Sequence, residues 1–478
     1  MSKQKIINPA TGEVLAEISQ LVKQEVEAAI QTARQAFDRG PWAKISLAER
    51  KNFLLKISQG ILDHAYELAQ LETKNTGKPI KESTFMDIPS SAKTFEYFAN
   101  NLEHYLKGKK IELDSKAESQ LLYEPRGVVV LIVPWNYPFL IASWKMAQAL
   151  AAGNTVILKP SSLTPLTALK LAEIVSEAGL PEGVVNVVNA SGIEVGSALC
   201  SDNRIDMISF TGSTETGKEI MNFASKNPKK LIMELGGKSA SIILADCDIE
   251  TAVSGALSSV FLNQGQMCTA MSRILIDKRI SERFKERFIK KAKKIKLGNG
   301  LDPETQMGPL ISEEHRQKVI SYVEKAKIEG ARVLCGGEIS GKPELKNGFF
   351  FEPTVFGQVD PEMSVFQQEI FGPVVCISEF SQEEEGIKLA NDSSFGLACS
   401  IWSNDLEKAR NLSKEINAGT IWINTYGMFY NAAPYGGFKQ SGFGKELGEE
   451  GFLEYTRLKH VNYDISGEKP LVASWYAL

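Results

Sequence analysis

The sequence lacks an excess of basic charge. Lys and Arg number 54 against 58 Asp and Glu, which gives a net charge of −4. Because binding to phosphate backbones normally needs a basic face, we expect no nucleic-acid partner. The lysine-rich run KKAKKIK at 290–296 is typical of the solvated face of a helix.

Long uninterrupted apolar runs are also missing. The first residues, MSKQKIINPATGE, hold no apolar core, so no secretory or transit segment is predicted. The longest apolar stretch, GVVVLIVPWNYPFLIASW at 127–144, is interrupted by Pro134, Asn136 and Pro138. That pattern predicts a buried strand, a turn and the start of a helix, and we expect no membrane span.

Cysteine is sparse and unpaired. There is no CxxC pair, so neither a disulfide framework nor a zinc site is predicted, and we expect no metal. Scattered free thiols fit a reducing, cytoplasmic location. Five of the six are interpreted as small buried hydrophobes. Cys268, within NQGQMCTAMSR, is the exception, and the six are Cys200, Cys247, Cys268, Cys335, Cys376 and Cys399.

The pattern of the chain predicts an α/β fold. With 478 residues, two or three packed units are expected. Residues 15–105 are predicted to be helical and 106–125 to form a hairpin. Short apolar runs then alternate with helical stretches, which favours parallel sheets with crossover helices. The runs are 127–134, 154–160, 184–190 and 205–210, then 239–244, 272–277, 331–337, 372–380 and 419–427; an extended segment follows at 455–465.

A glycine-containing turn follows one predicted strand. In IDMISFTGSTETGKE at 205–219, Ser213 and Thr214 are good N-caps, and free N–H groups at a helix start attract phosphate. The letters nearly match the phosphate-binding loop GxxxxGK[ST], but Glu219 stands where Ser or Thr must hold magnesium. The pattern therefore disfavours an ATPase or GTPase. It is not GxGxxG either, so a plain capped helix stays possible at this point.

Seven short segments stand out along the chain: PWNYPFLIASWK (134–145), FTGSTETG (210–217), MELGGKS (233–239), NQGQMC (263–268), QEIFGPV (368–374), PYGGFKQSG (434–442) and GKELG (444–448). In this order they resemble the motifs of the aldehyde dehydrogenase superfamily, whose members oxidise aldehydes to acids with NAD or NADP. The resemblance runs from NPATGE at 8–13 to the last strand. It implies a modified Rossmann-type cofactor domain, a second α/β catalytic domain and a small β oligomerisation arm.

The resemblance divides the chain into three parts. It places the cofactor-binding domain at 1–105 and 126–236, the catalytic domain at 237–440, and the oligomerisation arm at 106–125 and 455–478. Such an arm implies a homodimer or a homotetramer. The final strand is expected to pair with the early hairpin or with another subunit.

The chemistry of aldehyde oxidation gives Cys268 a role. A thiolate that adds to the carbonyl makes a tetrahedral adduct, which is a good hydride donor, and loss of hydride leaves a thioester. By resemblance, Glu234 is the base that activates water, and it is also a candidate to deprotonate the thiol. Asn136 and the Cys268 backbone N–H would stabilise the oxyanion. Lys145 and Glu446 match a proton path near that base.

The resemblance also implies a cofactor site. Many NAD-preferring relatives carry Glu three positions after the lysine that contacts the adenosine ribose, whereas this chain has Ser162 after Lys159. Without the repulsion of a carboxylate, we expect NADP⁺ to be accepted as well as NAD⁺. The predicted cofactor residues are Ile132, Trp135, Lys159, Ser162, Gly192, Gly196, Phe210, Gly212, Ser213, Gly217, Leu235, Glu369 and Phe371.

The expected substrate is a small-molecule aldehyde. Aromatic and apolar lining suits a medium or large hydrophobic aldehyde, and aromatic rings also suit a cationic one such as betaine aldehyde. Leu262 stands where plant aminoaldehyde dehydrogenases carry Trp, which counts against the cationic class. The predicted lining residues are Tyr137, Leu140, Trp144, Met267, Thr269, Phe429 and Tyr435.

Three alternatives to a dehydrogenase stay open at this point. One is a noncatalytic binding protein that retains the fold, against which intact Cys268, Glu234 and Asn136 count. Another is ester hydrolysis by the same thiol and base. A third, transfer of the acyl group to CoA, is disfavoured because Glu234 favours water as the acceptor.

Overall fold

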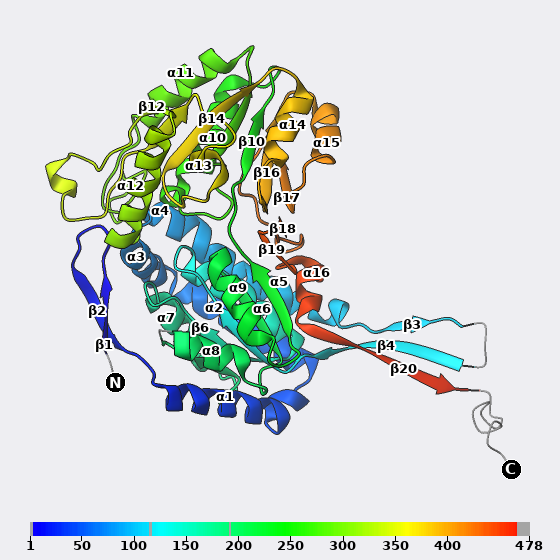
Figure 1. Cartoon of the computed structure of the whole chain (residues 1–478). Coiled ribbons are helices and arrows are strands. Elements are labelled where there is room, and N and C mark those ends of the chain that lie inside the picture. Colours follow the sequence, from blue (N-terminus) through cyan, green and yellow to red (C-terminus); the bar gives the residue numbers. More distant parts are fainter. Residues whose placement is uncertain (1–2, 114–116, 191–192, 466–478) are drawn as a thin grey trace.

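A computed structural model describes residues 3–113, 117–190 and 193–465. Figure 1 shows two bodies, each with a sheet between helices, and a long β arm that projects to one side. The predicted α/β class is confirmed. Among the described residues, no helix is both long and apolar enough to cross a membrane.

The first sheet has six strands and is parallel except at one edge. Its central strand, VVVLI, is an unbroken apolar run because both faces of a parallel sheet are covered. Chain order reverses between β5 and β8, which makes a crevice at the carboxyl ends of these two strands. The order is β19 (Gly442–Phe443), β9 (Lys230–Glu234), β8 (Met207–Thr211), β5 (Val128–Ile132), β6 (Thr155–Lys159) and β7 (Val185–Val187).

Alternate residues of β5 face two different helix layers. Val129 and Leu131 pack with one set of helices, and Val128 and Val130 pack with the other. The first layer contains α2 (Leu47–Asp63), α3 (Ala65–Thr76), α5 (Ile88–Tyr105), α6 (Pro138–Ala152) and α7 (Leu166–Glu177); the second contains α1 (Lys23–Asp38), α8 (Ile193–Ser201) and α9 (Thr214–Ala224).

The second sheet has seven strands, and only its edge strand β12 runs antiparallel. Helices α10 (Ile249–Phe261) and α11 (Ser281–Ala292) cover one face; α12 (Glu313–Ile328), α13 (Ser364–Gln367), α14 (Glu383–Asn391) and α15 (Leu406–Ser413) cover the other. The strand order is β12 (Arg332–Cys335), β13 (Thr354–Gly357), β14 (Val374–Phe380), β11 (Arg273–Asp277), β10 (Ala240–Ile243), β16 (Ala398–Trp402) and β17 (Thr420–Ile423).

The arm is a three-stranded antiparallel sheet. β3 (Lys109–Ile111) and β4 (Ala117–Pro125) form the predicted hairpin, and β20 (Thr456–Asp464) pairs with β4 along its whole length. The last strand therefore pairs with the early hairpin of its own chain. Residues 114–116 and 466–478 of the predicted arm lie outside the described residues.

The prediction that residues 15–105 are helical was wrong at its start. β1 (Lys3–Ile7) and β2 (Val14–Ser19) form an antiparallel hairpin, and the first helix begins at Lys23. Gly12, at φ 74°, supplies the left-handed turn residue that the connection needs. The remaining elements are short: α4 (Ile80–Glu82) and a π-helical turn (Ser83–Asp87), 3₁₀ turns at Pro41–Lys44, Leu262–Gly265 and Pro343–Leu345, strands β15 (Phe395–Gly396) and β18 (Phe438–Lys439), and α16 (Gly448–Glu454).

Candidate active site

Cys268 follows a tight left-handed turn. After α10, Asn263, Gln264 and Gly265 have φ of 46°, 58° and 70°. This conformation costs an L-residue about 1–2 kcal/mol, so it persists only where the surroundings hold it. Gly265 is pressed against its neighbour, since an added Cβ would lie 2.2 Å from the carbonyl oxygen of Gly372. The turn directs the following residues toward a cavity between the two sheets.

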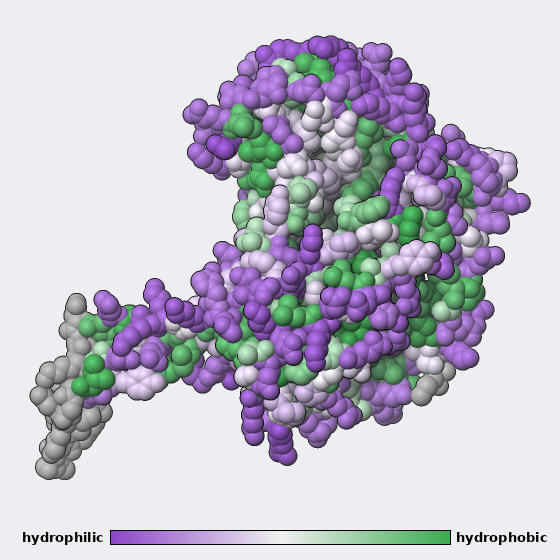
Figure 2. All heavy atoms as spheres, turned by 180° about the vertical axis from the view of Figure 1, so that it is seen from behind, coloured by the Kyte–Doolittle hydropathy of each residue, from purple (hydrophilic) through white to green (hydrophobic). Residues whose placement is uncertain are grey.

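The cavity has a volume of about 490 Å³ and reaches the Cys268 thiol. All seven predicted substrate residues line it, together with Glu234, Lys145, Glu446 and Leu262. Sequence reasoning missed several aromatic and apolar lining residues from the π-helical turn Ser83–Asp87, from α6 and from the loop after β17. Figure 2 shows apolar atoms gathered at the waist between the two bodies. The missed residues are Phe85, Met86, Ile141, Tyr426, Met428 and Tyr430.

The thiol has one side-chain hydrogen-bond partner. The hydroxyl of Tyr435 lies 3.4 Å from Cys268 Sγ. Burial raises the pKa of the thiol to about 12, and the contact with Tyr435 opposes that rise. Glu369 and Glu234 add negative charge nearby, which also raises the pKa. The resting thiol is therefore protonated, and a base or a positive charge must help to form the thiolate.

Asn136 lies beside the Cys268 loop. It belongs to the turn between β5 and α6, is 6% exposed, and donates from Nδ2 to the carbonyl oxygen of Gln266 at 2.8 Å. This bond takes one of the two hydrogens on Nδ2, so the second amide hydrogen stays available to another acceptor. Asn136 is not among the residues that line the cavity itself.

Glu234 ends β9 without a hydrogen bond to either carboxylate oxygen. Burial, and then the negative charge of Glu446, raise its pKa well above the usual value. Gly436 allows the carboxylate to approach the backbone, since an added Cβ would lie 2.6 Å from Glu234 Oε1. A buried carboxyl group of this kind, next to a thiol, is suited to accept a proton.

Lys145 and Glu446 form a buried ion pair behind that carboxylate. Lys145 Nζ donates to Glu446 Oε1 at 2.5 Å and to Ser209 Oγ at 2.6 Å. Gln148 donates to Glu446 Oε2 at 2.9 Å. The predicted proton-path residues are thus brought together at one end of the cavity.

The crevice at β5 and β8 holds most of the predicted cofactor residues. Ile132 and Lys159 end β5 and β6, and Phe210 lies on β8. Ser213 caps α9, accepting a hydrogen bond from the backbone N–H of Thr216 at 3.1 Å. Gly196 lies in α8, whereas Gly192 lies outside the described residues.

The backbone around the ends of β5 and β8 has features suited to a dinucleotide. A Cβ on Gly212 would lie 2.4 Å from the Phe210 ring, and one on Gly217 would lie 2.5 Å from Leu235, so only glycines allow the backbone this close. The buried hydroxyl of Thr214, in the first turn of α9, has no hydrogen-bond partner within the chain. Exposed N–H groups at the start of α9 suit a pyrophosphate.

The second body contributes Glu369 and Phe371 to the same region. Glu369 Oε1 accepts from the backbone N–H of Gly237 at 2.8 Å, and burial raises the pKa of this carboxyl to about 7. The rings of Phe371 and Trp135 meet edge to face at 5.2 Å between centroids. Ser162 follows β6 and accepts a hydrogen bond at its carbonyl oxygen from the Gln4 side chain on β1.

Among the residues that the structure describes, no group of three or more His, Cys, Asp or Glu side chains could hold a metal ion. A sheet edge suited to a dinucleotide, and a cavity lined by both a thiol and a buried carboxyl, are the features that an oxidoreductase working through a covalent thiol adduct requires.

The comparisons agree with that class and make it specific. The sequence profile of the Aldehyde dehydrogenase family matches residues 1–461, and the chain belongs to this family. The chain is 46% identical to betaine aldehyde dehydrogenase of Bacillus subtilis over 474 residues, which cover 99% of this chain and 96% of that protein. It is 41% identical to the human mitochondrial aldehyde dehydrogenase, covering 96% of this chain and 88% of the human protein.

A solved structure gives the same result. Betaine aldehyde dehydrogenase from Staphylococcus aureus, in complex with NAD⁺, superposes with a TM-score of 0.96 at 42% identity, covering 100% of this chain and 94% of that one. The protein is therefore an enzyme that oxidises aldehydes with NAD or NADP, as the sequence motifs predicted. A noncatalytic role is no longer favoured.

Proposed function

We propose that Cys268 is the nucleophile of this aldehyde dehydrogenase. The observation that carries the proposal is that Cys268, the only cysteine among the residues that line this cavity, lines it together with Glu234, a buried carboxyl without a hydrogen-bond partner. The thiolate adds to the aldehyde carbon, and the resulting oxyanion accepts hydrogen bonds from Asn136 Nδ2 and from the Cys268 backbone N–H. In crystals of the S. aureus relative a cysteine is modified by BME, which supports a reactive thiol in that protein.

Bound in the crevice between β5 and β8, NAD(P)⁺ supplies the hydride acceptor. The residues at the start of α9 would hold its pyrophosphate, Lys159 and Ser162 its adenosine ribose, and Glu369 its nicotinamide ribose. Loss of hydride from the Cys268 adduct leaves a thioester on the sulfur. Glu234 then takes a proton from water, whose oxygen attacks the thioester carbon, and the C–S bond breaks to release the carboxylic acid and the Cys268 thiolate. The Lys145–Glu446 pair carries that proton away.

The direct test is formation of reduced cofactor by ultraviolet absorbance. We expect turnover with an aldehyde and NAD⁺, and none in Cys268→Ala. Binding of NAD⁺ to that variant at the wild-type Kd shows that it is folded. Residual turnover in folded Cys268→Ala would refute the thiol mechanism.

A cationic aldehyde is the second candidate within this function. The rings of Trp144, Phe429 and Tyr435 surround one part of the cavity. The ring centroids are 5.6 Å apart for Trp144 and Phe429, 6.1 Å for Trp144 and Tyr435, and 5.2 Å for Phe429 and Tyr435. Such rings attract a quaternary ammonium by about 0.5–2 kcal/mol. Two relatives, from B. subtilis and rice, are named betaine aldehyde dehydrogenases. Leu262, which lines the same cavity, provides no ring.

A matched pair of substrates separates charge from shape. Betaine aldehyde and 3,3-dimethylbutanal have nearly the same size, but only the first carries a positive charge. A cation–π contribution of the size given above predicts a roughly 2- to 30-fold higher kcat/KM for betaine aldehyde. A higher kcat/KM for the neutral aldehyde would favour a hydrophobic substrate instead.

We also propose that the arm, formed by β3, β4 and β20, joins subunits into a homodimer or homotetramer. It projects away from the two bodies (Figure 1), and Leu458, Tyr463 and Ile465 are 57%, 46% and 61% exposed on it. β20 is also an edge strand of the arm, and an exposed strand edge is a template for pairing with another chain. Light scattering on wild type and on Leu458→Asp tests this; a wild-type monomer would refute it.

The proposed location is the cytoplasm. All six cysteines are free, which fits a reducing compartment. Fractionation of the native cells should recover the activity in the cytoplasmic fraction, and recovery from an oxidising compartment would contradict this.

A further inference from the structure

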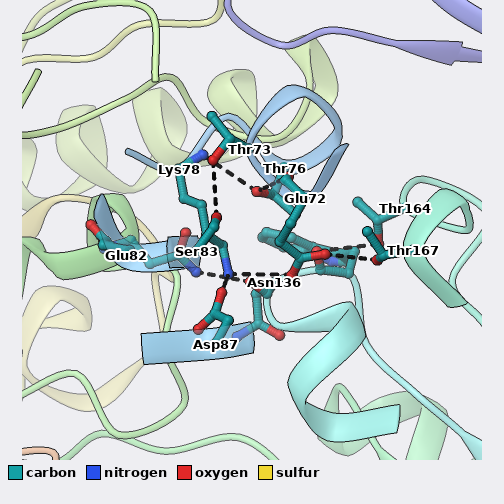
Figure 3. Close-up of polar contacts among 12 residues, drawn as sticks. Glu72, Thr73, Thr76, Lys78, Glu82, Ser83, Asp87, Asn136, Thr164 and Thr167 are labelled. Atoms are coloured by element: carbon teal, nitrogen blue, oxygen red, sulfur yellow. Dashed lines mark hydrogen bonds and ion pairs between the residues drawn. The ribbon is translucent and has the colours of Figure 1, made fainter. Parts of the chain in front are cut away.

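A buried group of charges, made up of Glu72, Lys78, Glu82 and Asp87, lies next to Asn136 (Figure 3) and also contacts the loop that leads to Cys268. Lys78 is completely buried, with Nζ 2.6 Å from Asp87 Oδ2 and 3.6 Å from Glu72 Oε1. The same ammonium lies 4.0 Å from the centre of the Tyr137 ring. Lys78 therefore supports the residue next to Asn136 in the chain.

A third carboxyl reaches the other loop. Glu82, the last residue of α4, is 3% exposed, and its Oε2 accepts a hydrogen bond from the backbone N–H of Asn263 at 3.1 Å. Asn263 in turn donates from Nδ2 to the carbonyl oxygens of Asn136 at 3.1 Å and of Gln266 at 3.3 Å. A continuous line of contacts thus runs from Glu82 through Asn263 to Asn136.

The turn before Cys268 needs such an anchor. Asn263 begins the run of three left-handed residues, and its N–H is buried away from water. A buried backbone N–H without an acceptor is strongly disfavoured. The second residue of the run, Gln264, is anchored through its side chain to the carbonyl oxygen of Pro309 at 2.9 Å. Glu82 anchors the first residue of the run, Asn263, by accepting a hydrogen bond from its backbone N–H.

We infer that Glu82 is a positioning residue for the oxyanion site: it holds Asn263, and through Asn263 it fixes the Asn136 side chain relative to the Cys268 loop. This inference rests on the function proposed above. Glu82 does not line the cavity, and it acts through the loop rather than on the aldehyde.

Glu82 is suited to do this without a negative charge. Burial raises the pKa of Glu82 to about 8 and that of Glu72 to about 7; the negative charge of Asp87 adds to the rise, and the positive charge of Lys78 opposes it. Near neutral pH the Glu82 carboxyl is mostly protonated, so it serves as a neutral acceptor. Glutamine, which has the same shape and keeps a carbonyl oxygen, should replace it.

The test compares Glu82→Gln with Glu82→Leu, which has similar size but no acceptor. Removing an oxyanion donor lowers kcat by about 100- to 1000-fold, and displacing one lowers kcat by less. We expect at least a roughly tenfold loss of kcat in the Leu variant, an unchanged KM for NAD⁺, and activity close to wild type in the Gln variant.

Two further measurements separate positioning from general damage. Hydrolysis of p-nitrophenyl acetate passes through an oxyanion and should fall in parallel with kcat in Glu82→Leu. Alkylation of Cys268 by iodoacetamide needs no oxyanion site and should keep its wild-type rate. Equal ester hydrolysis in Glu82→Leu and wild type would overturn the inference. Equal losses of alkylation and hydrolysis would also overturn it, because the thiol itself would then be displaced.

Cys268→Ala keeps the two proposals distinguishable. If that variant still hydrolyses the ester, the thiol mechanism fails, whatever the Glu82 variants do. If it does not, the Glu82 variants test the positioning role alone. Should Glu82→Leu fail to fold, Glu82→Asp replaces it, because its carboxyl is one methylene too short to hold Asn263. Wild-type ester hydrolysis in Glu82→Asp would overturn the inference.

Discussion

The hydroxyl of Tyr435 should lower the pKa of the Cys268 thiol, and Tyr435→Phe removes that hydroxyl while keeping the ring. The two groups lie 3.4 Å apart. Once the thiolate forms, the hydroxyl donates to a charged acceptor, and such bonds contribute about 1.5–3 kcal/mol. The lower end of that range corresponds to a rise of about one pKa unit on substitution.

The rate effect is smaller than the change in pKa. A rise of one unit lowers the thiolate fraction about tenfold, but a more basic thiolate is about threefold more nucleophilic at a Brønsted coefficient of 0.4–0.5. Alkylation of Cys268 by iodoacetamide should therefore be about threefold slower in Tyr435→Phe at every pH below the thiol pKa. The measurement is loss of dehydrogenase activity with time at several pH values, without cofactor.

Tyr426→Phe is the matched control. Its hydroxyl lies in the same cavity but 3.2 Å from Thr269 Oγ1 rather than against the thiol. We expect alkylation at the wild-type rate in this variant. A wild-type rate in Tyr435→Phe, or the same loss in both variants, would refute the role of the Tyr435 hydroxyl.

Four further outcomes follow from the site. Glu234→Gln should release about one reduced cofactor per site and then stop, because the thioester is no longer hydrolysed; continued turnover would contradict the assignment. Burial raises the pKa of Glu234, so hydrolysis of the thioester in the wild type should accelerate as pH rises through that pKa and the carboxylate forms. A hydrolysis step that does not depend on pH in stopped flow would argue against Glu234 as the base. Asn136→Ala should lower kcat by about 100- to 1000-fold with the Kd for NAD⁺ unchanged, which calorimetry can check. Ser162→Glu should lower kcat/KM for NADP⁺ far more than for NAD⁺, because a carboxylate repels a 2′-phosphate. An unchanged ratio of the two kcat/KM values would mean that the 2′-phosphate does not bind beside residue 162.

The sheets could be predicted because buried parallel strands are unbroken apolar runs. β5 has the sequence VVVLI, an unbroken apolar run without the polar positions that alternate with apolar ones along an amphipathic helix. The first hairpin could not be predicted in the same way. β2 reads VLAEIS, whose apolar residues fit both a strand and the first turn of a helix, and its identity depends on pairing with β1.

Motif order carries the most information about the candidate site where the backbone itself is constrained. Gly212, Gly265 and Gly436 stand where a Cβ would collide with neighbouring atoms, so their motifs mark the turns around the site. Tyr426 carried no such signal. It follows β17, and only the strand order of the second sheet brings that loop to the thiol.

The charges behind the site illustrate why tertiary contacts decide what a charged residue does. GKPIKE has the composition of a solvated turn, and no pattern distinguishes buried Lys78 and Glu82 from exposed Lys81 between them. The distinction arises from two tertiary contacts. The π-helical turn at Ser83–Asp87 places Asp87 in an ion pair with Lys78, and Glu82 accepts a hydrogen bond from the backbone N–H of Asn263, 181 residues further along the chain. A buried carboxyl is tolerated only where such partners exist, so its role can be read only once the loop it holds has been placed.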